Sequence, residues 1–179
     1  MNLRTRVWIA AIGLITSAGV AHALTADEAP RAPEFFATQA EQWINSPPLS
    51  LQDLEGKVVL LEFWTFGCHN CVRSIPWVKA MQERYRDDGL RVIGVHTPEF
   101  SYERSASAVR DKVRELAIRH PVMLDNDYAY WNAMGNRYWP AFYLIDRRGR
   151  VRQAWAGEIR NGSTRGREIQ HQLEAILAE

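Results

Sequence analysis

The sequence from residue 58 to residue 71 reads VVLLEFWTFGCHNC, and this stretch decides the fold. Residues 58–63 are rich in β-branched and aliphatic side chains on both faces, which is typical of a central strand that helices cover on each side. Gly67 ends this strand. Apolar residues then recur three and four positions apart, on one face of a predicted helix: Val72, Ile75, Val78, Met81 and Tyr85. The stretch therefore predicts a strand that delivers Cys68 to the first turn of a helix.

Cys68 and Cys71 are the two cysteines of the chain. Unpaired N–H groups and the dipole of a first helical turn stabilise a thiolate, which is the nucleophilic form of cysteine. We therefore expect Cys68 to be acidic and exposed. Cys71 should lie one turn further in, close enough to close a small disulfide ring. A C-x-x-C pair in a strand–helix–strand setting indicates redox chemistry, in which one sulfur attacks and the other resolves.

Three other uses of the two cysteines are open at this point. A structural disulfide would suit an exported chain, although so short a loop removes little entropy from the unfolded state. A zinc site needs further ligands, and the sequence holds no second C-x-x-C and no pair of histidines three to five residues apart. The third alternative is an unreactive buried pair. The strand–turn–helix context favours redox chemistry over all three.

The first residues predict export. Arg4 and Arg6 precede an apolar segment at residues 7–20, and residues 21–23 (AHA) supply small side chains at a cleavage step. This is typical of a secretory signal, so we expect cleavage near Ala23 and a periplasmic or otherwise exported product. The alternative is an uncleaved membrane anchor, for which the segment is short, because a span needs ~20 apolar residues.

Composition divides the rest of the chain into a proline-rich segment and one domain. Residues 24–48 are interpreted as a linker followed by a small β-hairpin around residues 45–48. The domain proper is expected at residues 49–179. The chain has 22 Lys and Arg against 21 Asp and Glu, mixed along its length, which argues against a nucleic-acid partner. We expect a monomer.

The domain itself predicts an α/β fold. Residues 90–95 (LRVIGV) form a second buried strand, which is reached through the helix after Cys71 and is therefore parallel to the first. Residues 106–117 carry apolar side chains at helical spacing, and residues 121–124 (PVML) predict a short strand. The chain thus contains an extra helix–strand unit at this point.

The remaining elements complete a mixed central sheet with helices on both faces. Residues 128–134 predict a short helix that carries aromatic side chains. Residues 141–145 and 151–156 predict an antiparallel hairpin with a glycine-assisted turn. Ser163 or Thr164 is expected to cap a last helix, which covers one side of the sheet.

Four segments of the sequence are informative because of the particular residues they contain. They are EFWTFGCHNC at residues 62–71, Pro76 five residues after the second cysteine, VIGVHTPEF at residues 92–100, and NRYWPAFYLID at residues 136–146, followed by GRV and Gly157. Together they resemble thioredoxin-fold proteins, and more narrowly the exported thiol–disulfide oxidoreductases of the TlpA/DipZ-like (redoxin) type. The resemblance covers about residues 49–179. It implies the thioredoxin fold, with the helix–strand insertion placed before a cis-proline.

The resemblance also implies how a client would bind. Trp139-Pro140 would be a cis peptide packed against the disulfide, and the backbone before the proline would hold an extended client segment by strand addition. Substrate-binding roles are implied for Pro140, Trp139, Trp64 and Phe66, and Trp77 would join the aromatic side chains in an apolar rim. The alternative for each of these aromatic residues is an ordinary position in the core.

Two further roles follow from the same resemblance. Glu62 stands where thioredoxins carry a buried acid, so its implied role is to accept the proton of Cys71 when that sulfur attacks the mixed disulfide. The alternative is a carboxylate at the edge of the core with a salt bridge. His69 and Asn70 occupy the two positions between the cysteines. A protonated His69 would stabilise the thiolate of Cys68 and make the disulfide more oxidising.

The function implied is exchange of a Cys68–Cys71 dithiol or disulfide with client proteins. The protein would act as a reductant fed by a CcdA/DsbD-like membrane thiol carrier, with clients in cytochrome c maturation or among oxidised exported proteins. We expect no metal and no cofactor besides the redox-active disulfide. His96, His120 and His171 are interpreted as surface or loop residues.

Two other functions stay open. One is a thiol peroxidase, because Thr65-x-x-Cys68 matches a peroxiredoxin T-x-x-C, although Leu61 stands where that motif has proline. The other is a periplasmic copper-binding chaperone on the same fold, which would use both sulfurs with His96 or His120.

Overall fold

The structure is a computed structural model that describes residues 29–179; the predicted signal sequence and its cleavage site lie outside them. The strands are β1 (Trp43–Ile44), β2 (Val58–Trp64), β3 (Leu90–His96), β4 (Val122–Leu124), β5 (Ala141–Ile145) and β6 (Val151–Ala156). The helices are α1 (His69–Tyr85), α2 (Ala106–Glu115), α3 (Ala129–Ala133) and α4 (Thr164–Leu177). Short 3₁₀ turns lie at Ala40–Gln42, Gln52–Leu54 and Ser101–Arg104.

The six strands form one mixed sheet in the order β1-β4-β3-β2-β5-β6. β2 lies between β3, to which it is parallel, and β5, to which it is antiparallel. β4 is parallel to β3, and the edge strands β1 and β6 are antiparallel to their neighbours. The predicted parallel pair around α1 and the predicted antiparallel hairpin are both confirmed.

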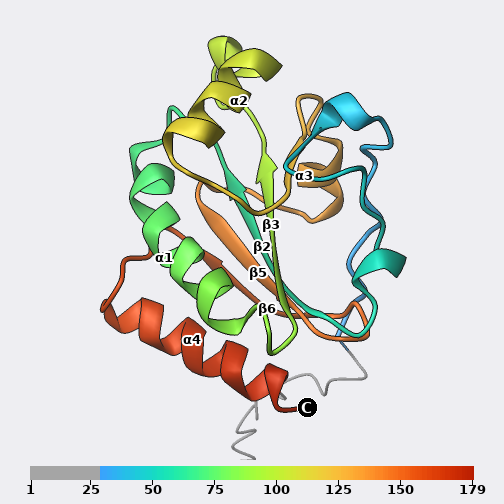
Figure 1. Ribbon diagram of the computed structural model, residues 1–179, viewed down its shortest axis with the longest axis vertical. Coiled ribbons are helices and arrows are strands. Elements are labelled where there is room, and N and C mark those ends of the chain that lie inside the picture. The colour runs from blue at the N-terminus through green and yellow to red at the C-terminus, as the bar shows by residue number, and fades with distance from the viewer. Residues whose placement is uncertain (1–28) are drawn as a thin grey trace, which may run out of the picture.

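Helices cover both faces of the sheet, with α1 and α4 on one face and α3 on the other (Figure 1). All seven residues of β2 are buried, because alternate side chains enter different cores. Leu60 packs with Trp77 and α4 on one face, whereas Leu61 and Phe63 pack with α3 and the N-terminal segment on the other. Each such side chain contributes about 1.5–3 kcal/mol of hydrophobic stabilisation.

The predicted insertion lies between β3 and β5 and contains α2, β4 and α3. Ser105 caps α2 by accepting a hydrogen bond from the backbone N–H of Ala108. α4 begins in the same way, because the hydroxyl of Ser163 accepts from the N–H of Gly166 at 3.0 Å. Of the two predicted caps of the last helix, Ser163 is thus the one used.

The predicted hairpin around residues 45–48 is wrong. β1 is followed by β2 with no intervening strand, and it pairs instead with β4, with Trp43 opposite Met123. The side-chain amide of Asn45 holds this pairing by donating to the backbone carbonyls of Ile118 and His120, each at 3.0 Å. Trp43 gains a nearly complete burial in the main core, at 3% exposure, which a local hairpin would not provide.

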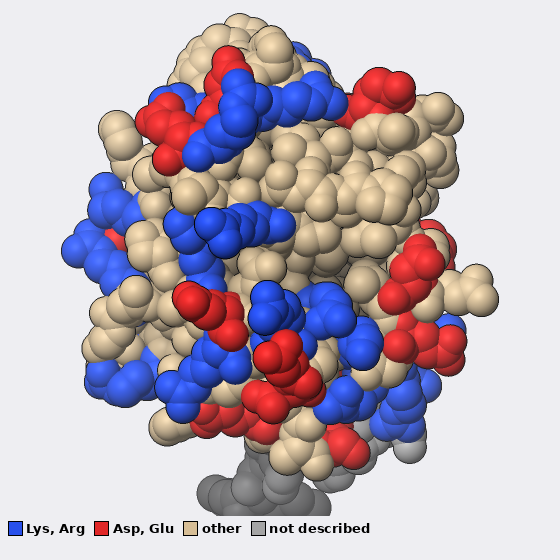
Figure 2. Space-filling view, in the orientation of Figure 1, with Lys and Arg blue, Asp and Glu red and all other residues tan. Residues whose placement is uncertain are grey.

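Basic and acidic side chains are interspersed on the face shown in Figure 2, without a field of one sign. Local pairs such as Lys112 with Glu115 on α2 account for part of this mixing. No helix within residues 29–179 is long and apolar enough to cross a membrane.

Candidate active site

Cys68 is the N-cap residue of α1, and it forms a disulfide with Cys71, one turn into the helix. The two Cα atoms are 5.3 Å apart, and the Cys68 sulfur accepts the backbone N–H of Cys71 at 3.2 Å. Cys68 is half-buried, whereas Cys71 is only 1% exposed. The more accessible sulfur is therefore the one at the start of the helix, where the backbone N–H of Cys71 and the helix dipole can stabilise a thiolate.

A buried carboxylate holds the turn that precedes Cys68. Glu103, in the 3₁₀ turn after β3, is fully buried and accepts three backbone N–H groups: from Gly67 at 2.8 Å, Glu99 at 2.6 Å and Phe100 at 2.8 Å. A Cβ atom on Gly67 would collide with this carboxylate and with the Tyr102 hydroxyl. The sequence pattern gave no sign of this contact between two distant loops.

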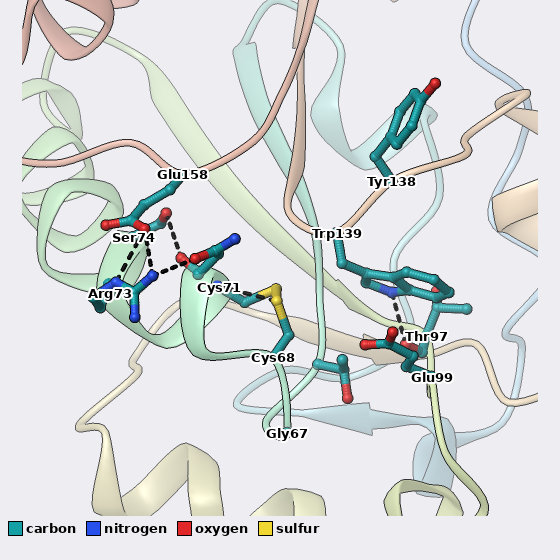
Figure 3. The surroundings of a disulfide bond; sticks show 12 residues. Gly67, Cys68, Cys71, Arg73, Ser74, Thr97, Glu99, Tyr138, Trp139 and Glu158 are labelled. Carbon is teal, nitrogen blue, oxygen red and sulfur yellow. Dashed lines mark hydrogen bonds and ion pairs between the residues drawn. A yellow bond between two sulfur atoms is a disulfide. The ribbon is translucent and has the colours of Figure 1, made fainter.

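The loop before β5 faces the disulfide, and the Trp139-Pro140 peptide is cis, as expected (Figure 3). The indole of Trp139 donates to the backbone carbonyl of Thr97 at 3.0 Å and packs on Trp131, with ring centroids 4.1 Å apart. These contacts attach the loop to the end of β3 and to α3.

Asp125 connects the same two segments, the end of β3 and α3, through hydrogen bonds. Its carboxylate accepts the N–H groups of Tyr130 and Trp131, both at 2.9 Å, and the hydroxyl of Thr97 at 3.0 Å. Burial raises the pKa of Asp125, and these three hydrogen bonds oppose that effect. The carboxylate thus ties α3, which supports Trp139, to the end of β3.

The predicted aromatic rim is only partly formed. Trp64 is fully buried and Trp77 is 2% exposed, so neither can line a client surface. Both side chains lie between α1 and the sheet. Trp64 points from β2 towards the helix, and Trp77 is on the face of α1 that packs on the sheet. Phe66 and Trp139 are partly buried and remain beside the sulfurs.

Two exposed aromatic side chains at the 3₁₀ turn after β3 add to the aromatic surface around Phe66. Phe100 and Tyr102 are 51% and 59% exposed and stack with centroids 5.8 Å apart. The Tyr102 ring also lies 5.9 Å from that of Phe66, which in turn stacks on His96. The insertion after β3 therefore supplies aromatic surface that the residues near the cysteines did not reveal.

Glu62 is fully buried beneath α1. Its neighbours on the same face of β2 are Leu60, which packs on Trp77, and Trp64, which packs with Cys71. Neither carboxylate oxygen has a hydrogen-bond partner among the described residues. The polar side chain beside it is His120, whose Nε2 lies 3.3 Å from Oε1. The acid is thus central in the core and not at its edge.

His96 and His120 are both fully buried, so neither is a surface residue. The interpretation is wrong for His96, which belongs to β3, whereas His120 does lie in a loop, before β4. His96 ends β3, where its Nε2 lies 3.2 Å from the Thr65 hydroxyl. Burial lowers the pKa of His96 to about 4, although the negative charge of Glu103 opposes this. His171 is exposed, as expected.

The two residues between the cysteines are exposed, and one of them forms a hydrogen bond with the arginine of a surface ion pair. The Asn70 side-chain oxygen accepts a hydrogen bond from Arg73. Arg73 also pairs with Glu158 at 2.7 Å (Figure 3). Hydrogen bonds from Arg73 and Arg160 lower the pKa of Glu158 to about 2. His69 is exposed next to Cys68 in the chain, so solvent screens the electrostatic effect of its side chain on that sulfur.

Within residues 29–179, no group of three or more His, Cys, Asp and Glu side chains is placed to hold a metal ion. The arrangement consists of one accessible sulfur at a helix start, a second sulfur bonded to it, and a buried carboxylate on the strand beneath. Such a site can exchange a disulfide with another thiol pair.

The AhpC/TSA family model matches residues 29–154. The thiol-disulfide oxidoreductase YkuV of Bacillus subtilis is 31% identical over 120 residues, which cover 67% of this chain and 80% of YkuV. Protein DipZ of Mycobacterium tuberculosis is 49% identical over 119 residues, which cover 65% of this chain but 17% of DipZ. The chain therefore matches a small part of DipZ.

A solved structure confirms the fold. A thioredoxin-like protein in the oxidised form aligns with a TM-score of 0.69 and 28% identity, and the alignment covers 83% of this chain and 96% of that one. The thioredoxin fold expected from the sequence is therefore present, with a mixed sheet and helices on both faces.

Proposed function

The chain belongs to the AhpC/TSA family and is a thiol–disulfide oxidoreductase, and from this premise we propose that it is an exported reductant of protein disulfides. The observation that carries the proposal is the half-buried Cys68 sulfur at the start of α1, bonded to the buried Cys71. Only the outer sulfur is accessible to a client, so the order of the two steps follows from burial.

The reaction has two exchanges. The Cys68 thiolate attacks a client disulfide, and a mixed disulfide forms while one client sulfur leaves as a thiolate. Cys71 then loses its proton to Glu62 and attacks the Cys68 sulfur, which releases the second client sulfur and closes the Cys68–Cys71 disulfide. The client gains two electrons, and the protein loses them.

Client binding is assigned to the surface that faces the sulfurs. Trp139 and Pro140 supply the backbone edge along which an extended client segment would add, and Phe66 supplies adjacent apolar surface. The packing of Trp139 against Thr97 and Trp131 supports this assignment, because it fixes the loop opposite the disulfide.

Electrons must return to Cys68 and Cys71 after each cycle. We assign this step to a CcdA/DsbD-like membrane thiol carrier and the clients to cytochrome c maturation or other oxidised exported proteins. The support is the signal-like sequence of residues 1–23 and the likeness to part of DipZ.

The experiment that tests the mechanism is trapping. A Cys71→Ser variant of the exported protein should accumulate clients covalently on Cys68, because the resolving sulfur is missing. Cys68→Ser is the matched control and should trap nothing. Absence of any reducible adduct on Cys71→Ser would reject the scheme, and the reduction potential of the wild-type couple would decide whether the protein reduces or oxidises.

A second function, thiol peroxidase, is favoured by the sequence Thr65-x-x-Cys68. Thr65 is fully buried, and its hydroxyl contacts His96. Consumption of hydrogen peroxide by the reduced protein at a rate comparable to disulfide reduction would support this function, whereas its absence would leave disulfide exchange alone.

A further inference from the structure

The buried carboxylate of Glu62 has a partner from outside the sequence motif. His120 precedes β4 and places Nε2 at 3.3 Å from Glu62 Oε1, with both side chains removed from solvent. Gly94 makes this approach possible, because it lies opposite Glu62 in the parallel pair of β2 and β3. A Cβ atom at Gly94 would lie 3.3 Å from His120 Nε2 and 3.1 Å from the indole nitrogen of Trp64.

The contact of the second imidazole nitrogen, Nδ1 of His120, bears on which ring nitrogen carries the hydrogen. His120 Nδ1 lies 3.3 Å from the side-chain oxygen of Gln82, on α1. With the Gln82 amide oriented in this way its oxygen only accepts, so we assign the hydrogen of the ring to Nδ1. In a neutral ring Nε2 is then an acceptor, and it faces a carboxylate oxygen that is also an acceptor when ionised. A proton between Nε2 and Oε1 turns this repulsive contact into an attractive one.

We propose that Glu62 and His120 hold one proton between them in the oxidised protein, and that this is the proton Cys71 gives up when the disulfide closes. The proposal deepens the proposed function and rests on it. The structure contains the closed disulfide, which is the state in which the pair must be loaded. His120 is therefore a positioning residue, which acts on Cys71 through Glu62.

The proton balance is complete in both directions. On closing, the S–H bond of Cys71 breaks, its electron pair forms the S–S bond to Cys68, and the proton passes to the Glu62–His120 pair. The departing client thiolate takes a proton from water. On reduction by a dithiol donor, the pair returns its proton to the Cys71 sulfur as the S–S bond breaks.

The Gln82 side chain that contacts His120 also lines a cavity. Gln82 is half-buried, and this cavity of about 520 Å³ lies beside α1 and the segment before β4. The charged groups there are Lys79 and Glu83 from α1, Arg86 directly after it, and Arg119 from the segment before β4. Lys79 is held by the Leu116 carbonyl. From the sheet, the titratable groups on this face are Glu62 and, beyond Trp64, His96.

The test separates the two chemical steps. Reduced protein is mixed with one equivalent of 5,5′-dithiobis(2-nitrobenzoate), which releases one coloured thiolate when Cys68 attacks and a second when Cys71 resolves. His120→Gln should leave the rate of the first phase unchanged, slow the second phase about tenfold and change the pH dependence of the second phase. His171→Gln, at an exposed histidine, is the control and should match the wild type.

A second measurement needs no variant. Nitrogen-15 NMR of the His120 ring in the wild-type protein should show a hydrogen on Nδ1 and a change at Nε2 when the disulfide is reduced. Unchanged Nε2 on reduction would overturn the proposal, as would a second phase in His120→Gln with the wild-type rate and pH profile. Absence of any second phase in the wild type would instead refute the proposed function, and the NMR result would still decide where the proton is.

Discussion

Replacing Glu103 with alanine tests whether a carboxylate from the insertion holds the active-site turn. The change removes the acceptor of three backbone N–H groups, from Gly67, Glu99 and Phe100. Because Glu103 is fully buried, its contacts are shielded from competing water. The variant should therefore unfold more easily, and the Gly67 turn should be affected first.

The magnitude follows from the number and exposure of the donors. A hydrogen bond to a charged group contributes about 1.5–3 kcal/mol, so three would give an upper bound of about 4.5–9 kcal/mol. Glu99 and Phe100 are exposed residues, whose N–H groups can turn to water in the variant. Gly67 is half-buried and has less access to water. We therefore expect Glu103→Ala to cost about 2–4 kcal/mol.

Urea unfolding of the oxidised protein measures this cost. Glu103→Gln is the matched control, because it keeps one carbonyl oxygen in place and should lose about half as much stability. A matched exposed carboxylate, changed in Glu83→Ala, should leave the midpoint almost unchanged. If Glu103→Ala unfolded within about 0.5 kcal/mol of the wild type, the claim that this carboxylate holds the turn would be refuted.

Three further outcomes are expected. Burial lowers the pKa of His96 from 6.5 to about 4, so the unfolded chain alone binds this proton between those values. The contribution of His96 to the free energy of unfolding is therefore fully present above pH 6.5, and the protein loses about 3 kcal/mol of stability as the pH falls towards 4. Urea unfolding of the His96→Asn variant should lack this part of the pH dependence. Gly94→Ala should cost about 1–3 kcal/mol in the same assay through overpacking, and an unchanged midpoint would contradict the close packing there. Arg73→Ala should leave the midpoint nearly unchanged, because its pair with Glu158 is at the surface; a shift as large as that of Glu103→Ala would contradict this.

The central strand and the start of α1 could be predicted because their signals are local. The apolar run of β2 and the spacing after Cys68 are properties of neighbouring residues, and the structure confirms the strand, the helix and the parallel pair with β3. The inserted helix and strand were predictable for the same reason.

What the sequence could not provide are contacts between distant segments. β1 pairs with β4 across about 80 residues, and nothing local in Trp43 or Asn45 indicates that partner. Glu103 and His120 look like ordinary polar residues in their own segments, because their roles come from Gly67 and Glu62 far away in the chain. Trp64 was misplaced at the surface for a related reason, since a strand residue next to a motif can face the core.

The most direct measurement is the reactivity of Cys68 as a function of pH. In reduced Cys71→Ser protein, the rate of alkylation by iodoacetamide reports the thiolate fraction of the remaining sulfur. If the first turn of α1 stabilises the anion, the rate should reach half its maximum at least one pH unit below the value of about 8.5 for a free cysteine. A midpoint at or above about 8.5 would contradict the claim that this helix start makes Cys68 the attacking nucleophile.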